Sequence, residues 1–221
     1  MKKVVIVSAK RTAIGSFNGV LSSFTSGQLG SFAIKAIMED SKIDPNLIDE
    51  VIMGNVLMGG QGQAPARQSA IFAGLPNKTE CLTINKMCGS GLKSVMLAQQ
   101  SIALGDAEII IAGGQESMSN APYLLPKARN GYRLGHGEIK DSIVFDGLWD
   151  LYNNIHMGGC AESCARDFSF TREELDNFAI QSYKRAIEAT NTGRFKDEIF
   201  PVKFSSRNGE TIIDKDEEPE K

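Results

Sequence analysis

The sequence predicts an α/β fold in which helices cover a mostly parallel sheet. Strand-like and helix-like segments alternate through the first 119 residues, as they do in successive βαβ units. The strand-like runs 4–7 and 109–111 are almost continuously apolar, which is typical of strands buried on both faces. The chain has 221 residues, 42% hydrophobic and 23% charged, so it is long enough for a sizeable core and is neither disordered nor a coiled coil.

The elements of this first part follow the order strand, helix, strand, helix, strand, helix, strand. Pro65 suits the first turn of the second helix, and Gly105 suits the end of the third. The third helix has Leu92, Val95 and Met96 on one face. We expect strands over 3–9, 50–57, 81–85 and 108–112, and helices over 28–41, 65–73 and 91–104.

The pattern changes after residue 119, so we divide the chain into an α/β domain, 1–119, and a loop domain, 120–221. Residues 120–155 show little periodicity, as expected of long functional or partner-binding loops. A helix then begins at Met157, and a capping box, Thr171 with Glu174, opens another that ends near Gly193. The runs 198–204 and 210–213 flank Asn208-Gly209, a good hairpin turn.

Charge and cysteine content exclude several classes of protein. Lys and Arg number 24 against 27 Asp and Glu, a net charge of −3, which argues against a nucleic-acid surface. No apolar run is long enough to span a membrane, and Lys10 and Arg11 interrupt the N-terminal apolar stretch before it could act as a signal peptide. Four cysteines are too few for a disulfide framework, and one Cys-x-x-x-Cys is a poor zinc motif. We expect a cytoplasmic protein with reduced thiols and no metal.

Cys88 is the residue best placed for chemistry. It follows a short strand and precedes Gly89-Ser90-Gly91 and a helix, so its thiol should lie on a tight turn beside the N-terminus of that helix. The positive end of the helix dipole favours thiolate there, and the glycines would leave N–H groups for a developing oxyanion. This arrangement is similar to a nucleophile elbow. The spacing alone fits a buried structural cysteine equally well.

The run 84–95, Ile-Asn-Lys-Met-Cys-Gly-Ser-Gly-Leu-Lys-Ser-Val, resembles the acyl-cysteine motif of the thiolase family. Further stretches resemble the same family, at 9–15, 54–57, 63–68, 113–123 and 146–148. The resemblance implies a thiolase-like fold in which Cys88 accepts an acyl group. It also implies condensation of two acetyl-CoA to acetoacetyl-CoA, and the reverse thiolysis, with coenzyme A thioesters as substrates and no cofactor.

His156-Met157-Gly158 resembles a loop of the biosynthetic acetoacetyl-CoA thiolases. The resemblance implies that His156 lies against coenzyme A, that Met157 narrows the acyl pocket, and that Leu148 touches the coenzyme. Met157 is alternatively a core residue of the helix it begins, and Cys160 and Cys164, on the same face, are expected to be small core residues.

Thiolases contain two copies of this α/β unit, and the motifs resemble the first copy only. The histidine that activates the nucleophile and the second cysteine belong to the other copy, and the last strand of the first unit is also absent. Glu220 stands where the family usually has an Arg that helps bind coenzyme A. The hypothesis that follows is that this chain contains the nucleophile but is inactive alone.

Three alternatives stay open at this point. The chain could belong to another condensing enzyme of the same fold, or to a degradative 3-ketoacyl-CoA thiolase. It could also be a non-catalytic module that binds coenzyme A or assembles with other chains. The resemblance implies a homodimer, or a homotetramer bridged by the loop 120–145.

Overall fold

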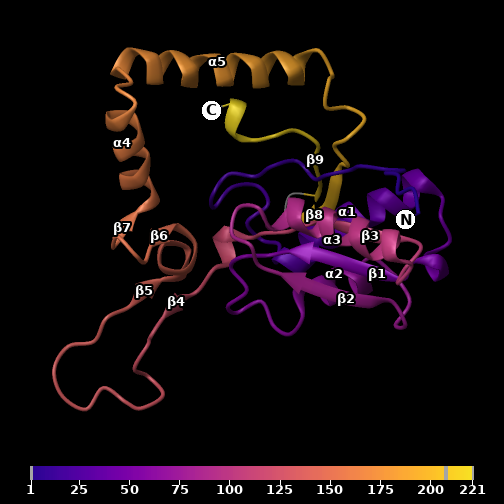
Figure 1. Ribbon diagram of the computed structural model, residues 1–221, viewed down its shortest axis with the longest axis horizontal. Coiled ribbons are helices and arrows are strands. Elements are labelled where there is room, and N and C mark those ends of the chain that lie inside the picture. Colours follow the sequence, from indigo (N-terminus) through magenta and orange to yellow (C-terminus); the bar gives the residue numbers. More distant parts are fainter. Residues whose placement is uncertain (1, 207–208, 221) are drawn as a thin grey trace.

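The computed structural model describes residues 2–206 and 209–220, and its centre is a three-stranded parallel sheet (Figure 1). The strands are β1 (Glu50–Gly54), β2 (Glu80–Ile84) and β3 (Ile110–Gly114), in the order β2-β1-β3. Glu50 pairs with Glu80 and Ile110, and Gly54 pairs with Ile84 and Gly114. The strands therefore start together at one edge, the amino edge, and end together at the other, the carboxyl edge.

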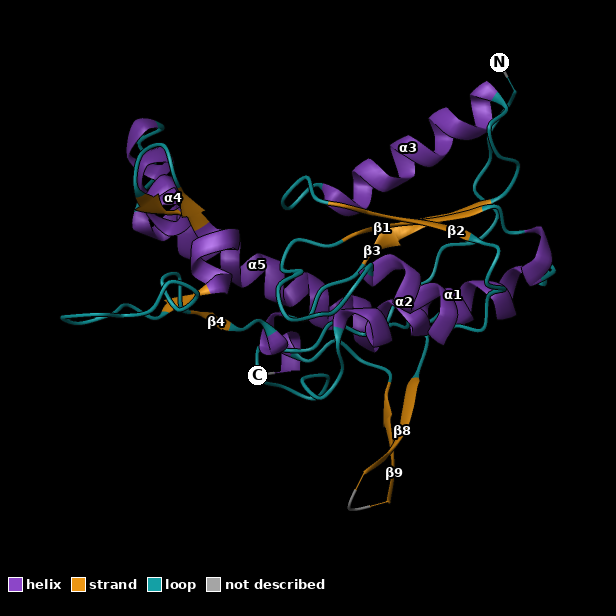
Figure 2. Cartoon of the chain, turned by 90° about the horizontal axis from the view of Figure 1, so that it is seen from below, coloured by secondary structure: helices purple, strands orange, loops and turns teal. Residues whose placement is uncertain are grey.

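Helices cover both faces of the sheet (Figure 2). α1 (Ser26–Ser41) and α2 (Pro65–Phe72) pack together on one face, and α3 (Ser90–Leu104) lies on the other. α1 opens with a capping box between Thr25 and Gln28, which satisfies N–H groups that a helix start leaves without partners. The predicted helices and the predicted strands over 50–57, 81–85 and 108–112 are confirmed, with ends shifted by at most three residues.

The main core lies between the sheet and the α1–α2 layer. Val51, Ile52 and Met53 in the central strand are each no more than 3% exposed, so β1 is buried on both faces as its apolar run indicates. The buried residues of this cluster are Ile34, Ile48, Val51, Met53, Ala66, Ala70, Leu75 and Ile111.

A second core joins the C-terminal hairpin to α1. The hairpin consists of β8 (Val202–Ser206) and β9 (Gly209–Ile213), which pair as predicted; Asn208 of its turn lies outside the described residues. Phe24 packs edge-on against Phe32 at 5.2 Å and against Phe204 at 5.1 Å between ring centroids. These contacts fix a late segment of the chain against an early one.

The segment between residues 121 and 191 extends away from the sheet as an arm (Figure 1). It contains β4 (Tyr123–Leu124) paired with β5 (Lys140–Asp141), a π-helix (Ile143–Leu148), and β6 (Trp149–Asp150) paired with β7 (Ile155–His156). α4 (Met157–Asp167) and α5 (Arg172–Asn191) follow. The predicted capping box between Thr171 and Glu174 is confirmed at the start of α5. Short 3-10 turns occur at Pro45–Leu47, Met118–Asn120 and Glu218–Glu220.

The predicted strand over residues 3–9 is wrong. The structure shows an extended segment that pairs with no strand of the sheet, and Val5, Ile6 and Val7 are 63%, 78% and 67% exposed. A strand needs a neighbouring strand to accept its hydrogen bonds, and the described residues place none beside this segment.

Two helix faces also differ from expectation. Leu92 and Met96 of α3 are 70% and 49% exposed, because the helix presents small residues, Ser94 and Ala98, to the sheet. Ser94 Oγ donates to the carbonyl of Gly113 at 2.7 Å, a distance that larger side chains at this interface would prevent. In α4, Cys160 is half-buried and Cys164 is exposed, so neither is the core residue expected.

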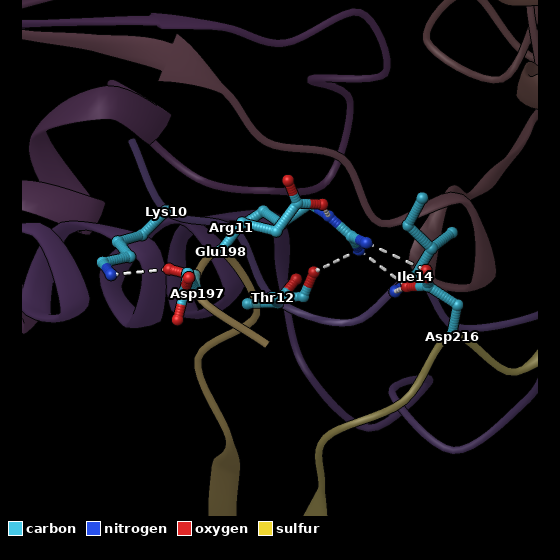
Figure 3. Close-up of polar contacts among 7 residues, drawn as sticks. All are labelled: Lys10, Arg11, Thr12, Ile14, Asp197, Glu198 and Asp216. Atoms are coloured by element: carbon cyan, nitrogen blue, oxygen red, sulfur yellow. Dashed lines mark hydrogen bonds and ion pairs between the residues drawn. The ribbon is translucent and has the colours of Figure 1, made fainter. Parts of the chain in front are cut away.

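Arg11 fastens the N-terminal segment to the end of the chain (Figure 3). Its guanidinium donates to both carboxylate oxygens of Asp216, at 2.7 and 3.0 Å, and to Glu198 Oε1 at 2.7 Å. Asp216 also accepts from the N–H of Ile14 at 2.8 Å. Partial burial alone would raise the pKa of Asp216, but these hydrogen bonds and the charge of Arg11 hold it below its usual range. The stretch 9–15, which resembles the thiolase family, is therefore joined to Asp216 near the C-terminus.

Candidate active site

Cys88 lies on the turn that connects β2 to α3, at the carboxyl edge of the sheet. Its side chain is exposed and its thiol is free. Ligands of parallel α/β sheets bind outside the carboxyl ends of the strands, because the loops that meet there supply side chains and helix N-termini. The sequence prediction of a thiol on a strand-to-helix turn is confirmed, and the alternative of a buried structural cysteine is wrong.

The turn that carries Cys88 is held by hydrogen bonds on both sides of it. Met87, just before it, has a φ of +48°, a left-handed conformation that is costly for a residue with a long side chain. Ser90 is only 4% exposed; its hydroxyl accepts from the N–H of Lys86 at 2.8 Å and donates to the carbonyl of Met87 at 2.6 Å. Asn85 Oδ1 accepts from the N–H of Met87 at 2.9 Å. These bonds offset the backbone strain at Met87.

The N–H of Gly89, a glycine expected to leave its N–H group for an oxyanion, is used inside the turn, and so is the N–H of Ser90. The N–H of Gly89 donates to the carbonyl of Lys86 at 3.2 Å, and that of Ser90 donates to the carbonyl of Met87 at 3.0 Å. The glycines near Cys88 have a different role, which is packing.

Three glycines let the N-terminus of α3 approach the strand ends. A Cβ on Gly54 would lie 2.6 Å from two atoms of Ser90, and a Cβ on Gly114 would lie 3.3 Å from the Cα of Gly91. Side chains at Gly54 and Gly114 would therefore push α3, and the Cys88 turn with it, away from the sheet.

A buried polar network lies behind the turn, centred on Glu116. Its carboxylate follows β3 and accepts from Asn55 Nδ2 at 2.5 Å, from the N–H of Val56 at 2.8 Å and from the N–H of Leu57 at 3.1 Å. Burial raises the pKa of Glu116, although its three hydrogen bonds act in the opposite direction. Asn55, 1% exposed, also accepts from Ser26 Oγ of α1 at 3.1 Å.

The residues expected to bind the substrate, His156 and Leu148 against coenzyme A and Met157 at the acyl pocket, lie in the arm. Leu148 is half-buried at the end of the π-helix; a Cβ on its neighbour Gly147 would lie 3.5 Å from Leu57 Cδ2, so this part of the arm touches the carboxyl edge. His156 caps α4, its Nδ1 accepting from the N–H of Gly158 at 3.0 Å, and Met157 is 41% exposed. β7 and α4 lie apart from the sheet in Figure 1, so His156 and Met157 are not brought to Cys88. The three roles stay predictions.

The arrangement supplies an exposed free thiol, and in the described part of the chain the histidines lie in the arm. His136 and His156 are the two histidines, and both belong to the arm. Among residues 2–206 and 209–220 no group of three or more His, Cys, Asp or Glu side chains could hold a metal, and no helix is long and apolar enough to cross a membrane. The side chain of Glu220 lies outside the described part.

The family model of the thiolase N-terminal domain matches residues 4–221. The chain belongs to the thiolase family. The sequence is 51% identical to an acetyl-CoA acetyltransferase of Pseudomonas aeruginosa over 99% of this chain and 56% of the relative. It is 53% identical to acetyl-CoA acetyltransferase 1 of Arabidopsis thaliana over 98% of this chain and 52% of that relative. A probable acetyl-CoA acetyltransferase of Escherichia coli is 49% identical over 99% and 56%. The chain thus spans about half the length of the curated relatives it matches.

Family membership confirms the thiolase-like α/β fold predicted from the residues around Cys88. Sequence reasoning did not assign roles to Ser90, Gly54, Asn55 or Glu116, although all four fall within the stretches that resemble thiolases. A signal for two of them was available: Asn55 and Glu116 follow buried strands at the edge where parallel strands end together.

Proposed function

We propose that this chain supplies the acyl-accepting nucleophile, Cys88, of an acetyl-CoA acetyltransferase that condenses two acetyl-CoA to acetoacetyl-CoA and catalyses the reverse thiolysis. The observation that carries the proposal is an exposed thiol on a hydrogen-bonded turn at the carboxyl edge of the sheet, in a member of the thiolase family. The shared name of the relatives at about 50% identity favours this reaction over degradation of long ketoacyl chains.

In the first half-reaction the Cys88 thiolate attacks the thioester carbonyl of acetyl-CoA. A bond forms between Sγ and the carbonyl carbon, and the bond from that carbon to the coenzyme A sulfur breaks. Coenzyme A leaves as a thiol once it takes up the proton that Cys88 released, and acetyl-Cys88 remains. In the second half-reaction a base removes a proton beside the thioester of another acetyl-CoA, and the resulting carbanion attacks the acyl carbon of acetyl-Cys88. The bond from that carbon to Cys88 Sγ breaks, which gives acetoacetyl-CoA and a Cys88 thiolate, and the thiolate takes up the proton that the base removed. Covalent catalysis divides one difficult condensation into two easier steps.

The second half-reaction needs a base to remove a proton beside a thioester, together with donors for the resulting oxyanion. Neither histidine of the chain lies beside Cys88 in the described structure. We therefore propose that the chain accepts an acetyl group and does not complete the condensation unaided. We propose that His156 and Leu148 contact coenzyme A from the arm and that Met157 narrows the acyl pocket. Residues 1–119 and 120–221 are proposed as separate domains.

The test is to incubate the intact chain with acyl-CoA and to measure the gain in protein mass that acyl transfer produces. We expect one acetyl group per chain from acetyl-CoA, slower transfer from octanoyl-CoA, no transfer to the Cys88→Ala variant, and no thiolysis of acetoacetyl-CoA. Faster transfer from octanoyl-CoA would instead support a degradative thiolase. Acetoacetyl-CoA thiolysis by the 221-residue chain would contradict the proposal that it needs further residues.

We propose a cytoplasmic, homo-oligomeric enzyme. All four cysteines are free thiols, which suits a reducing compartment. The arm carries exposed apolar side chains, including Phe178 at 73%, of the kind that subunit contacts cover. Size-exclusion chromatography with light scattering tests the oligomer, and a monomer at micromolar concentration would contradict it.

A further inference from the structure

A chain of hydrogen bonds leads from Glu116 to the turn that carries Cys88. Glu116 holds the segment 55–57 through the three bonds that its carboxylate accepts. This segment in turn contacts the end of β2 at two points: the N–H of Asn55 donates to the carbonyl of Ile84 at 3.0 Å, and Asn85 Nδ2 donates to the carbonyl of Val56 at 3.5 Å. Asn85 then accepts from the N–H of Met87, next to Cys88.

The two contacts differ in strength. The bond from Asn55 to Ile84 has ordinary length, and Asn55 is almost fully buried, so this link is strong. The bond from Asn85 Nδ2 to Val56 is at the long limit for a hydrogen bond, and Asn85 is exposed. Glu116 should therefore act on the Cys88 turn mainly through Asn55 and the end of β2.

We propose that Glu116 and Asn55 are positioning residues for Cys88, which hold the β2–α3 turn through segment 55–57. This inference rests on the proposed function, because it concerns the orientation of the proposed nucleophile. The hydrogen bonds of Glu116 join it to Asn55, Val56 and Leu57 and not to the thiol. Its carboxylate accepts hydrogen bonds from the segment that follows β1, and this segment is hydrogen-bonded to the end of β2, where the turn begins.

The charge of Glu116 is essential to this role. Its Oε1 accepts from both Asn55 Nδ2 and the N–H of Leu57, and its Oε2 accepts from the N–H of Val56. In Glu116→Gln one of these acceptors becomes an NH₂ donor that faces another donor, so at least one bond is lost while the shape of the side chain is kept.

The structure offers a matched control at the amino edge of the same sheet. Asp49 Oδ2 accepts from the N–H groups of Glu108 and Ile109, at 2.7 and 3.0 Å, and so joins the starts of β1 and β3. Asp49→Asn removes a carboxylate with the same type of backbone contact, at the end of the strands opposite to Cys88.

Backbone hydrogen exchange, resolved by peptide mass, tests the proposal. We expect Glu116→Gln to speed exchange at least tenfold over residues 55–58 and 86–90, and to leave 108–111 unchanged. Asp49→Asn should speed exchange over 108–111 and leave 86–90 unchanged. Faster exchange at 55–58 in Glu116→Gln with no change at 86–90 would overturn the proposal, as would the same change at 86–90 in both variants.

Glu116→Asp keeps the proposal testable if Glu116→Gln fails to fold, because it retains the carboxylate and only draws it back from Asn55, Val56 and Leu57. It should speed exchange over 55–58 and 86–90 together; faster exchange over 55–58 with unchanged exchange over 86–90 would contradict the positioning role. Acetyl transfer to Cys88 is measured separately on the same samples. A turn that responds to Glu116 in a chain that accepts no acetyl group would contradict the proposed function and leave the positioning role supported.

Discussion

At each edge of the sheet a carboxylate accepts hydrogen bonds from backbone N–H groups, but one carboxylate is exposed and the other is half-buried. At the amino edge, exposed Asp49 accepts two backbone N–H groups, and those hydrogen bonds hold its pKa below the usual range. At the carboxyl edge, half-buried Glu116 accepts two backbone N–H groups and an amide, yet burial raises its pKa. The surroundings of Asp49 favour its ionised form, whereas the burial of Glu116 disfavours its ionised form. Such an unfavourable placement is typical of a site shaped for function.

The two edges also differ in how closely their elements pack, and Gly54→Ala, at the carboxyl edge, should have the largest effect on stability. Its Cβ would lie 2.6 Å from Ser90, against backbone that cannot move without moving the Cys88 turn. We expect a loss of about 3 kcal/mol in the free energy of unfolding, measured with urea. Gly113→Ala is the control, because its Cβ would meet only Met53 Sδ at 3.8 Å. Equal losses in the two variants would mean that the approach of α3 to Gly54 is not tight.

Ser90→Ala tests the hydrogen bonds of the turn. The hydroxyl is buried and makes two bonds, and its removal leaves the N–H of Lys86 without that acceptor, so we expect a loss of about 1–2 kcal/mol. Acetyl transfer to Cys88 should slow by more than this loss of stability explains, because Met87 would no longer be held in its left-handed conformation. Ser101→Ala, on the same helix, should change neither quantity; unaltered acetyl transfer in Ser90→Ala would contradict the role of these hydrogen bonds.

The smallest expected effect is a difference in pH dependence between the edges. The pKa of Glu116 is higher in the folded chain than the unfolded value of about 4.3, so the folded state binds more protons in the window above that value. Its contribution to stability therefore falls as the pH rises through this window, and Glu116→Gln should abolish that slope. Asp49 has a lowered pKa, so its contribution is present above about pH 3.9 and is lost as the pH falls; Asp49→Asn should remove this opposite slope.

Urea midpoints between pH 3 and pH 8 measure both slopes. Slopes of the same sign for the two carboxyls would show that burial at the carboxyl edge does not outweigh the hydrogen bonds of Glu116.

The elements that could be predicted from the sequence are those that depend on residues close together in the chain. The helices of the α/β core, the capping box at Thr171 and the turn at Cys88 depend on spacing and end signals within a few residues. The strand expected over 3–9 failed because pairing depends on a distant neighbour, and residues 5–7 have none among the described residues. The face of α3 that packs was not foreseen, because Ser94 and Ala98 carry little hydrophobic signal although their small size lets the helix approach the sheet closely.

The most direct measurement of the central claim is site-resolved acetylation of the intact chain by acetyl-CoA. Cys164 is an internal reference, since it is a second exposed thiol and lies on α4, away from the sheet. We predict that acetyl accumulates on Cys88 at least ten times faster than on Cys164, and that Ser90→Ala reduces this ratio while Asp49→Asn preserves it. Equal rates at the two cysteines would contradict the claim that the carboxyl edge makes Cys88 an acyl acceptor.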